Sequence, residues 1–220
     1  VGEDPMTGQV AVLASYPSYD PNVFTDPSKS SGISTIINDP DSPLLNRAIA
    51  GVYPPGSTFK LATALAGLAS GKITAQTLIE DTGIMALGPY TFANWYFTEY
   101  GRKEGLVDII KGLQRSNDIF FYQVGQKVGV DYLGQTARQL GMGKKLGIDL
   151  PGEADGLIPN DQWKQQNLDT SWYPGDTLHM AIGQGFVLTT PLQILAQTAY
   201  VASSGKLMQP HLVNKITTAD

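Results

Sequence analysis

Ser57 and Lys60 stand three residues apart, and this pair has the clearest capacity for chemistry in the sequence. A serine hydroxyl is a weak nucleophile until a neighbouring base takes its proton. Pro54-Pro55-Gly56 stops the chain just before Ser57, and apolar residues at helical spacing follow, so both side chains should lie on one face at a helix start. Burial would lower the pKa of Lys60 and let the neutral amine act as the base. The pattern therefore predicts acyl transfer through Ser57, with the free N–H groups of the helix start facing a developing oxyanion.

The same two residues allow a simpler interpretation, in which Ser57 caps the helix and Lys60 extends along it to solvent. Further segments decide between the two interpretations because they form an ordered series. In chain order they are Asp4-Pro5-Met6-Thr7-Gly8, Ser15-Tyr16-Pro17-Ser18-Tyr19-Asp20-Pro21-Asn22, Asn46-Arg47-Ala48, Tyr53-Pro54-Pro55-Gly56-Ser57-Thr58-Phe59-Lys60, Arg115-Ser116-Asn117-Asp118-Ile119-Phe120-Phe121-Tyr122, Gly147-Ile148-Asp149-Leu150-Pro151-Gly152-Glu153, Ala181-Ile182-Gly183-Gln184-Gly185 and Thr189-Thr190-Pro191-Leu192-Gln193.

This series resembles, in order and over nearly all of the chain, the motifs of high-molecular-weight penicillin-binding proteins. The resemblance implies that Ser57 is the acylated nucleophile, that Lys60 is its base, and that Ser116 relays a proton to the leaving-group nitrogen. The family's second motif is Ser-x-Asn, and here Asp118 occupies its third position, as in class B proteins of the cell-elongation type. An ionised carboxylate can only accept hydrogen bonds, unlike an asparagine. The residues expected to contact substrate or to line the floor of the cleft are Asn117, Gln184 and Gly185.

The family resemblance implies a D,D-transpeptidase that cross-links peptidoglycan stem peptides and is trapped covalently by β-lactams. No metal or organic cofactor is implied. Expected partners are a glycosyltransferase and other cell-wall elongation proteins. The expected location is extracytoplasmic, with a membrane anchor upstream of the chain. Two alternatives stay open: a non-catalytic penicillin-recognising sensor or scaffold, and, on weaker grounds, a β-lactamase.

The family's third motif, Lys-Thr-Gly or Lys-Ser-Gly, does not occur in the sequence. In the family this motif lies on a strand that lines the cleft and supplies an oxyanion N–H and a cationic contact for the substrate carboxylate. We therefore expect residues 1–220 to be a single, incomplete transpeptidase domain. Its fold should be α+β, with helices packed on an antiparallel sheet and several strands missing.

The local patterns predict few strands and several helices. A strand is expected over 9–15, with the end of another before Asp4, and 16–44 reads as a long surface excursion. The expected helices are 57–70, buried and nearly uncharged; 107–128, interrupted at 115–118; 132–140; and 191–203.

The composition excludes several other classes of function. The formal net charge of −5, with no basic patch, argues against nucleic acid as a partner. The chain has no cysteine, which excludes disulfides and thiolate metal sites. His179 and His211 lack metal-ligand spacing and are expected to be structural. The acidic residues of the 146–160 loop are expected to be solvated rather than metal ligands; they are Asp149, Glu153 and Asp155.

Overall fold

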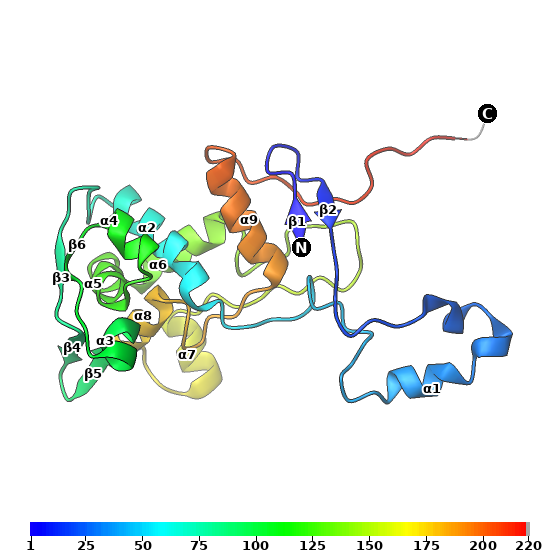
Figure 1. The fold of residues 1–220 in the computed structure, drawn as a ribbon, viewed down its shortest axis with the longest axis horizontal. Coiled ribbons are helices and arrows are strands. Elements are labelled where there is room, and N and C mark those ends of the chain that lie inside the picture. The colour runs from blue at the N-terminus through cyan, green and yellow to red at the C-terminus, as the bar shows by residue number, and fades with distance from the viewer. Residues whose placement is uncertain (219–220) are drawn as a thin grey trace. The chain divides into compact units, whose positions relative to one another are not determined.

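The computed structural model describes residues 1–218 and has an α+β fold, in which helices predominate and strands form short antiparallel pairs (Figure 1). The chain divides into two compact units. The first unit comprises residues 1–52, 145–155 and 189 onward, and the second comprises 53–144 and 156–188. Because each unit is assembled from separate stretches, no linker composition marks the division in the sequence.

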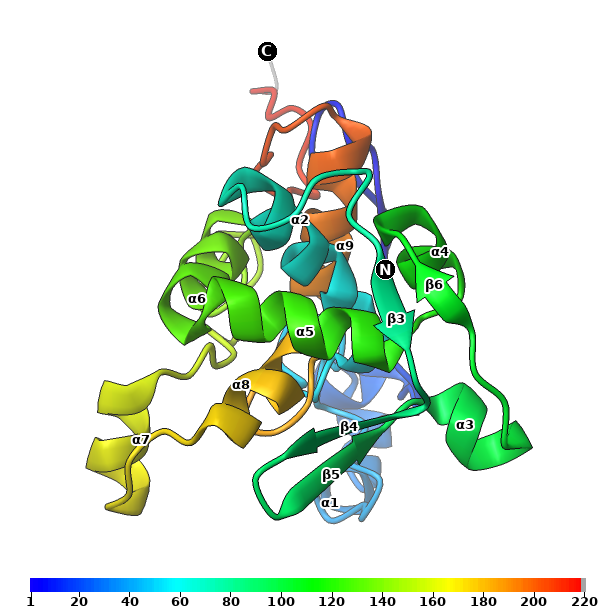
Figure 2. The ribbon, with the colours of Figure 1, turned by 90° about the vertical axis from the view of Figure 1, so that its left-hand side faces the viewer.

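Helix α5 (Asp118–Val128) is the centre of the second unit, and α2 (Lys60–Ala69), α6 (Val130–Gln139) and α8 (Pro174–Ala181) pack against it (Figure 2). Gly125 lets α8 approach closely, because a Cβ there would lie 2.4 Å from the Cβ of Ala181.

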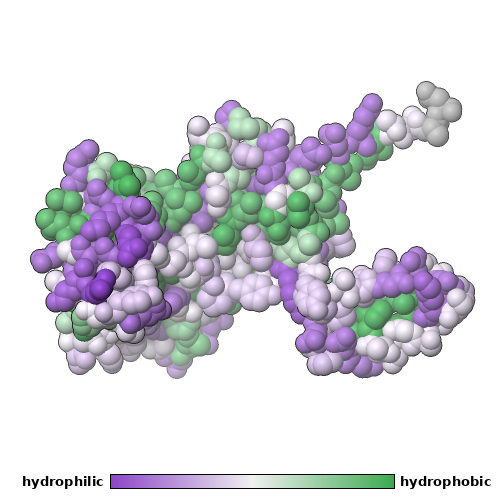
Figure 3. All heavy atoms as spheres, viewed as in Figure 1, coloured by the Kyte–Doolittle hydropathy of each residue, from purple (hydrophilic) through white to green (hydrophobic). Residues whose placement is uncertain are grey.

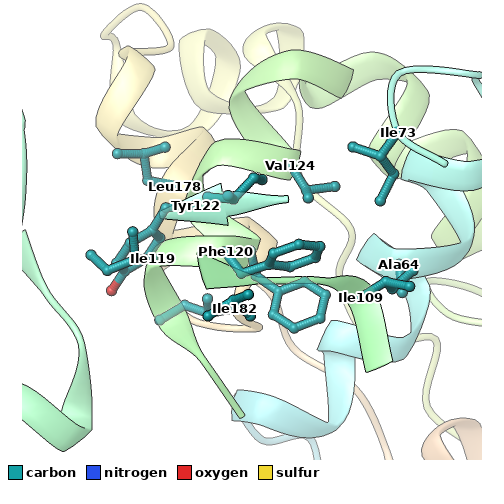
Figure 4. Packing of buried hydrophobic residues seen from close by; sticks show 12 residues of the cluster. Ala64, Ile73, Ile109, Ile119, Phe120, Tyr122, Val124, Leu178 and Ile182 are labelled. Atoms are coloured by element: carbon teal, nitrogen blue, oxygen red, sulfur yellow. The ribbon is translucent and has the colours of Figure 1, made fainter. Parts of the chain in front are cut away.

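The core of the second unit is built on the apolar side chains of α5. Figure 4 shows Phe120 and Val124 of this helix within a cluster that also holds Ala64 and Leu178 from its neighbours. Phe120 has no exposed surface, and burying such a side chain contributes about 1.5–3 kcal/mol. The apolar side chains that follow Asn117 therefore hold α5 in the core and with it the start of this helix, where the second motif lies.

Four short strands in the second unit were missed by the sequence prediction. β3 (Ile79–Asp81) pairs with β6 (Gly105–Val107), and β4 (Ile84–Leu87) pairs with β5 (Tyr90–Ala93) in a hairpin, all antiparallel. They form separate two-stranded sheets, and no larger antiparallel sheet occurs among residues 1–218. Strands of three or four residues hold too few alternations to stand out in a sequence. The other helices of this unit are α3 (Trp95–Tyr100), α4 (Ile109–Gln114) and α7 (Asp161–Leu168).

The predicted helices are confirmed to within a few residues. The interrupted 107–128 stretch is α4 and α5, the 132–140 helix is α6, and the 191–203 helix is α9 (Pro191–Ala202). The buried 57–70 helix is α2, preceded by a 3-10 turn, Gly56–Phe59.

The alternative interpretation, in which Ser57 caps this helix, was wrong. Ser57 lies inside the 3-10 turn, and neither the turn nor α2 has a side-chain cap. The turn starts at Gly56, one residue before Ser57, and the N–H of Gly56 donates to the carbonyl of Gly183 at 2.8 Å. The hydroxyl of Ser57 therefore accepts no backbone N–H as a helix cap.

The first unit has β1 (Gly2–Glu3) paired antiparallel with β2 (Val10–Val12), and α9 beside them. β2 is shorter than the predicted 9–15 strand. The surface excursion contains two 3-10 turns, Pro21–Phe24 and Pro27–Lys29, and helix α1 (Gly32–Ile37), none with a buried residue. The buried core of this unit consists of Val10, Ala48, Ile49, Ile148 and Leu192.

Exposed apolar side chains gather in the second unit beside β6 and α4. Leu106 is 61% exposed and Ile110 is 70% exposed. Figure 3 shows hydrophobic atoms at the edge of the molecule where β6 lies in Figure 1. Among residues 1–218, none of the helices has both the length and the apolar character needed to span a membrane.

Candidate active site

A pocket of about 470 Å³ in the second unit brings residues of the two sequence motifs around Ser57 and Ser116 together. Ser57 opens onto it from the 3-10 turn, and Ser116 and Asp118 reach it from the start of α5. The rest of its lining consists of Ala93, Trp95, Thr98, Glu99, Tyr122, Ile182 and Gln184.

Lys60 lies beneath this pocket and is held by the second motif. Its Nζ donates to the carbonyl of Ser116 at 2.7 Å, to the Oγ of Ser116 at 3.0 Å and to Oδ1 of Asp118 at 2.6 Å. The side chain of Lys60 is 2% exposed and that of Asp118 is 13% exposed. Three donated bonds are the full capacity of an ammonium group, so this geometry is that of the protonated lysine.

The surroundings of Lys60 favour loss of its proton. Burial lowers the pKa of Lys60, and the charge and hydrogen bond of Asp118 raise it by a smaller amount, so the net shift is downward. Deprotonation would release one of the three hydrogen bonds and leave a lone pair on Nζ. A neutral amine held this way can accept a proton at a pH where a solvated lysine cannot.

Ser57 is exposed, and its hydroxyl makes no hydrogen bond to another residue of the described chain. The three hydrogen bonds that Lys60 donates go to Ser116 and Asp118, and the prediction that Lys60 serves as the base of Ser57 stays a prediction. The hydroxyl is therefore available to a substrate.

Gly183 supports the turn that carries Ser57. A Cβ at Gly183 would lie 2.2 Å from the carbonyl oxygen of Gly56 and 2.6 Å from the Cβ of Phe59. Gly183 also has a φ of +72°, which side-chain-bearing residues rarely adopt. Close backbone contact and left-handed geometry together require glycine here.

The second motif is held in an unusual backbone conformation. Ser116 has a φ of +49°, in the left-handed region where residues other than glycine are uncommon. This conformation lets its carbonyl and its hydroxyl face Lys60 together. Asp118 is fixed from a second side, because its Oδ2 accepts the N–H of Trp95 at 3.0 Å.

The three residues predicted to contact substrate have different surroundings. Gln184 is exposed and lines the pocket. Gly185 is exposed with a φ of +70°, outside the pocket lining, and a Cβ there would lie 3.2 Å from that of His179. Asn117 is fully buried and caps α5: its Oδ1 accepts the N–H of Phe120 at 2.8 Å. Its Nδ2 donates to Asp81, so we assign Asn117 to the support of the site rather than to substrate contact.

Several residues of the site have no motif that marks them in the sequence. Trp95 and Glu99 line the pocket, and neither belongs to one of the motifs. The buried residues Asp81 and Asn94, which hydrogen-bond to Asn117 and Asp118 of the second motif, are likewise marked by no motif. No cluster of three or more metal-binding side chains occurs in residues 1–218, where Asp149 and Glu153 accept backbone N–H groups.

Comparison with known sequences assigns the family. The sequence model described as "Penicillin binding protein transpeptidase domain" matches residues 1–219. The chain belongs to this family. The α+β fold predicted from the motifs is the penicillin-binding transpeptidase fold, as the solved structures below also show.

Three relatives illustrate the family membership. Peptidoglycan D,D-transpeptidase MrdA of Escherichia coli is 40% identical over 212 residues, which are 96% of this chain and 33% of the relative. The PBP2 of Helicobacter pylori, solved in complex with MreC, superposes with a TM-score of 0.88 at 35% identity, covering 98% of this chain and 40% of that one. Penicillin-binding protein A of Mycobacterium tuberculosis, solved as its penicillin G acyl-enzyme, superposes with a TM-score of 0.79 at 29% identity, covering 96% and 47%.

The transpeptidase-family match thus covers this chain almost completely, whereas the chain spans about a third of the curated relative's length.

Proposed function

We propose that this chain carries the acylating site of a peptidoglycan D,D-transpeptidase, with Ser57 as nucleophile. The observation that carries the proposal is the buried Lys60, held by Ser116 and Asp118 below a pocket onto which Ser57 opens. A serine nucleophile beside a base that is itself oriented by a third group is the arrangement that nucleophilic catalysis requires.

The proposed reaction begins when Ser57 Oγ attacks the carbonyl of a D-Ala-D-Ala peptide while neutral Lys60 takes the hydroxyl proton. Ser116, which contacts Lys60 Nζ at 3.0 Å, passes a proton to the departing nitrogen, and D-alanine leaves. The amine of a second stem peptide then attacks the ester and releases Ser57. With a β-lactam the ring opens, the nitrogen stays tethered, and the acyl-enzyme persists.

Asp118 would act through Lys60 rather than on substrate, since one carboxylate oxygen holds Nζ and the other holds the N–H of Trp95. Gln184 would contact the bound peptide from the pocket rim. Gly185 has no side chain and would leave the adjoining backbone accessible to that peptide. The start of the 3-10 turn supplies N–H groups with no partner inside the turn, one of which can face the oxyanion.

The relatives support the wider setting of the proposal. The name of the Escherichia coli relative, peptidoglycan D,D-transpeptidase, supports stem peptides as the substrate here. The Helicobacter pylori complex with MreC supports elongation proteins as partners, and the penicillin G acyl-enzyme supports β-lactams as ligands. A glycosyltransferase partner, an upstream membrane anchor and an extracytoplasmic location are part of the same proposal. No cofactor is required by the proposed steps.

Labelling with a fluorescent penicillin tests the nucleophile. The natural full-length protein should be labelled at a single site that maps to Ser57, and S57A should lose all labelling. The matched control is S70A, which removes a serine hydroxyl at the far end of α2, where it donates to the carbonyl of Gly67. Labelling that persists in S57A would refute the assignment. Acylation of Ser57 without cross-linking of stem peptides would favour the sensor alternative.

A further inference from the structure

Asp81, the last residue of β3, is a carboxylate buried without a cation. It is 2% exposed, and no lysine or arginine of the described chain pairs with it. Its Oδ1 accepts the N–H of Gly83 at 2.7 Å, and its Oδ2 accepts the N–H of Glu104 at 3.1 Å. A buried charge is costly unless it is well hydrogen-bonded, so this position demands an explanation.

The remaining partners of Asp81 lead to the second motif. Its Oδ2 accepts Nδ2 of Asn94 at 2.7 Å and Nδ2 of Asn117 at 2.8 Å. Both asparagines have no exposed surface. Asn117 caps α5, and Oδ1 of Asn94 accepts the N–H of Asp118 at 3.1 Å. One carboxylate thus orients two amides, and each amide holds the backbone at the start of α5.

The amide orientation matters because an asparagine side chain can be turned around. With Oδ2 of Asp81 accepting from both Nδ2 groups, the amide oxygens are forced toward the N–H groups of Phe120 and Asp118. If either amide were turned, its NH2 group would face the backbone N–H and its oxygen would face the carboxylate of Asp81, so two buried hydrogen bonds would be lost. The negative charge of Asp81 therefore selects the orientation that holds the second motif in place.

We propose that Asp81 is a positioning residue for the acylation reaction, which acts through Asn94 and Asn117 to keep Ser116 and Asp118 around Lys60. Neither Asp81 nor Asn94 lines the pocket, and Asp81 is not within hydrogen-bonding distance of Lys60. Its contribution is to the geometry of the base. The inference rests on the proposed acylation of Ser57.

The test separates the binding of a penicillin from its acylation step in the natural full-length protein. Stopped-flow labelling gives the dissociation constant of the first, non-covalent complex and the first-order acylation rate constant. The variant D81N keeps the size of the side chain but removes its charge, and with its oxygen kept at the Oδ2 position it places an amide NH2 donor against the N–H of Gly83. Misplacement of a catalytic group by about 1 Å can cost about 100-fold in rate, so we expect acylation to slow by about 10–100-fold.

A role confined to folding predicts a different result, and D176N is the matched control for it. Asp176 is another carboxylate of the second unit, largely buried; its Oδ2 accepts from Nζ of Lys164 at 2.6 Å and from the N–H of Tyr173 at 2.7 Å. Both variants should lower the melting temperature. Only D81N should slow acylation, with the dissociation constant changed by less than about two-fold.

N94A keeps the proposal testable if D81N does not fold. It removes the acceptor of the Asp118 N–H while leaving the charge of Asp81, and it should slow the same acylation step. The double variant D81N/N94A should be no slower than the slower single variant, because both act through one chain of contacts. Wild-type acylation rate constants in D81N or N94A would overturn the inference. Labelling that survives S57A would instead remove the proposed function beneath it.

Discussion

In the first unit, the carboxylates of Asp149 and Glu153 each accept two backbone N–H groups and hold loop segments together. In the second unit, Asp81 and Asp118 do similar work, but they are largely buried and their partners lead to Lys60. Carboxylates thus hold loop segments together in the first unit, whereas in the second unit they belong to a buried hydrogen-bond network that includes Lys60.

Burial accounts for the difference. Electrostatic interactions strengthen as water is excluded, and an unpaired buried polar group costs more than an exposed one. Changes within the network of the second unit should therefore alter chemistry as well as stability. Changes at the carboxylates of the first unit should have local consequences only.

The largest effect is expected from G183A in the second unit. The added methyl group would meet the carbonyl of Gly56 and the Cβ of Phe59, and the turn carrying Ser57 would have to shift. Such a displacement of a nucleophile is expected to slow penicillin acylation by about 100-fold. Stopped-flow labelling of the full-length protein measures it.

G71A is the control for backbone strain. Gly71 follows α2 with a φ of +68°, close to that of Gly183, but a Cβ there meets nothing within 4 Å. Both substitutions carry the cost of a left-handed alanine, which is about 1 kcal/mol. Only G183A should slow acylation beyond the loss of folded protein. Equal slowing in the two variants would mean that strain, not contact with the nucleophile turn, sets the rate.

A smaller effect, with a characteristic pH dependence, is expected from D118N. Burial lowers the pKa of Lys60 and Asp118 raises it in part, so removing the charge should lower this pKa further. In the proposed mechanism acylation needs the neutral amine, so its rate should rise as pH increases through the pKa of Lys60. In D118N this rise should move to lower pH, and the plateau rate should fall by about ten-fold because Lys60 is held less firmly.

The other groups near Lys60 should leave this pH limb unobscured. The ring of Phe121 carries no charge, and burial together with the charge of Asp118 raises the pKa of Tyr122, which keeps that phenol neutral. D108N is a suitable control, since Asp108 caps α4 through its bond to the N–H of Lys111 and asparagine caps equally well. A limb that stays in place or moves to higher pH in D118N would contradict the assignment of Lys60 as the base.

The contrast between the units also explains what could be predicted from the sequence. The sequence could propose Ser57, Lys60, Ser116 and Asp118 as site residues because short motifs contain them. It could predict α2, α5 and α9 because their apolar residues recur at helical spacing. The hydrogen bond between Lys60 and Asp118 could not be predicted, because it joins residues 58 positions apart in the sequence.

Nor could the sequence mark Asp81 for burial. Its partners Asn94 and Asn117 stand 13 and 36 positions away, and each of these residue types is common in exposed turns. The strands β3 to β6 could not be predicted for a related reason: each is short and depends on pairing with another strand.

The smallest effect is expected at Asp149 in the first unit. Its carboxylate accepts the N–H groups of Leu212 and Val213, both at 2.8 Å, and these bonds lower the pKa of Asp149. Because the folded pKa lies below the unfolded one, the stabilisation is present above the usual aspartate pKa of about 3.9 and is lost as the pH falls through the folded value. The amide proton shifts of Leu212 and Val213, followed by NMR, should therefore titrate together with a midpoint below about 3.9.

D149N should abolish this titration and leave penicillin acylation at the wild-type rate. E153Q is the matched variant, because Glu153 accepts the N–H groups of Leu146 and Gly147 at 2.6 and 2.9 Å, and it should change those two signals instead. A slower acylation step in D149N would show that a carboxylate of the first unit also supports the site. The distinction between the carboxylates that hold loops in the first unit and the buried network around Lys60 would then no longer hold.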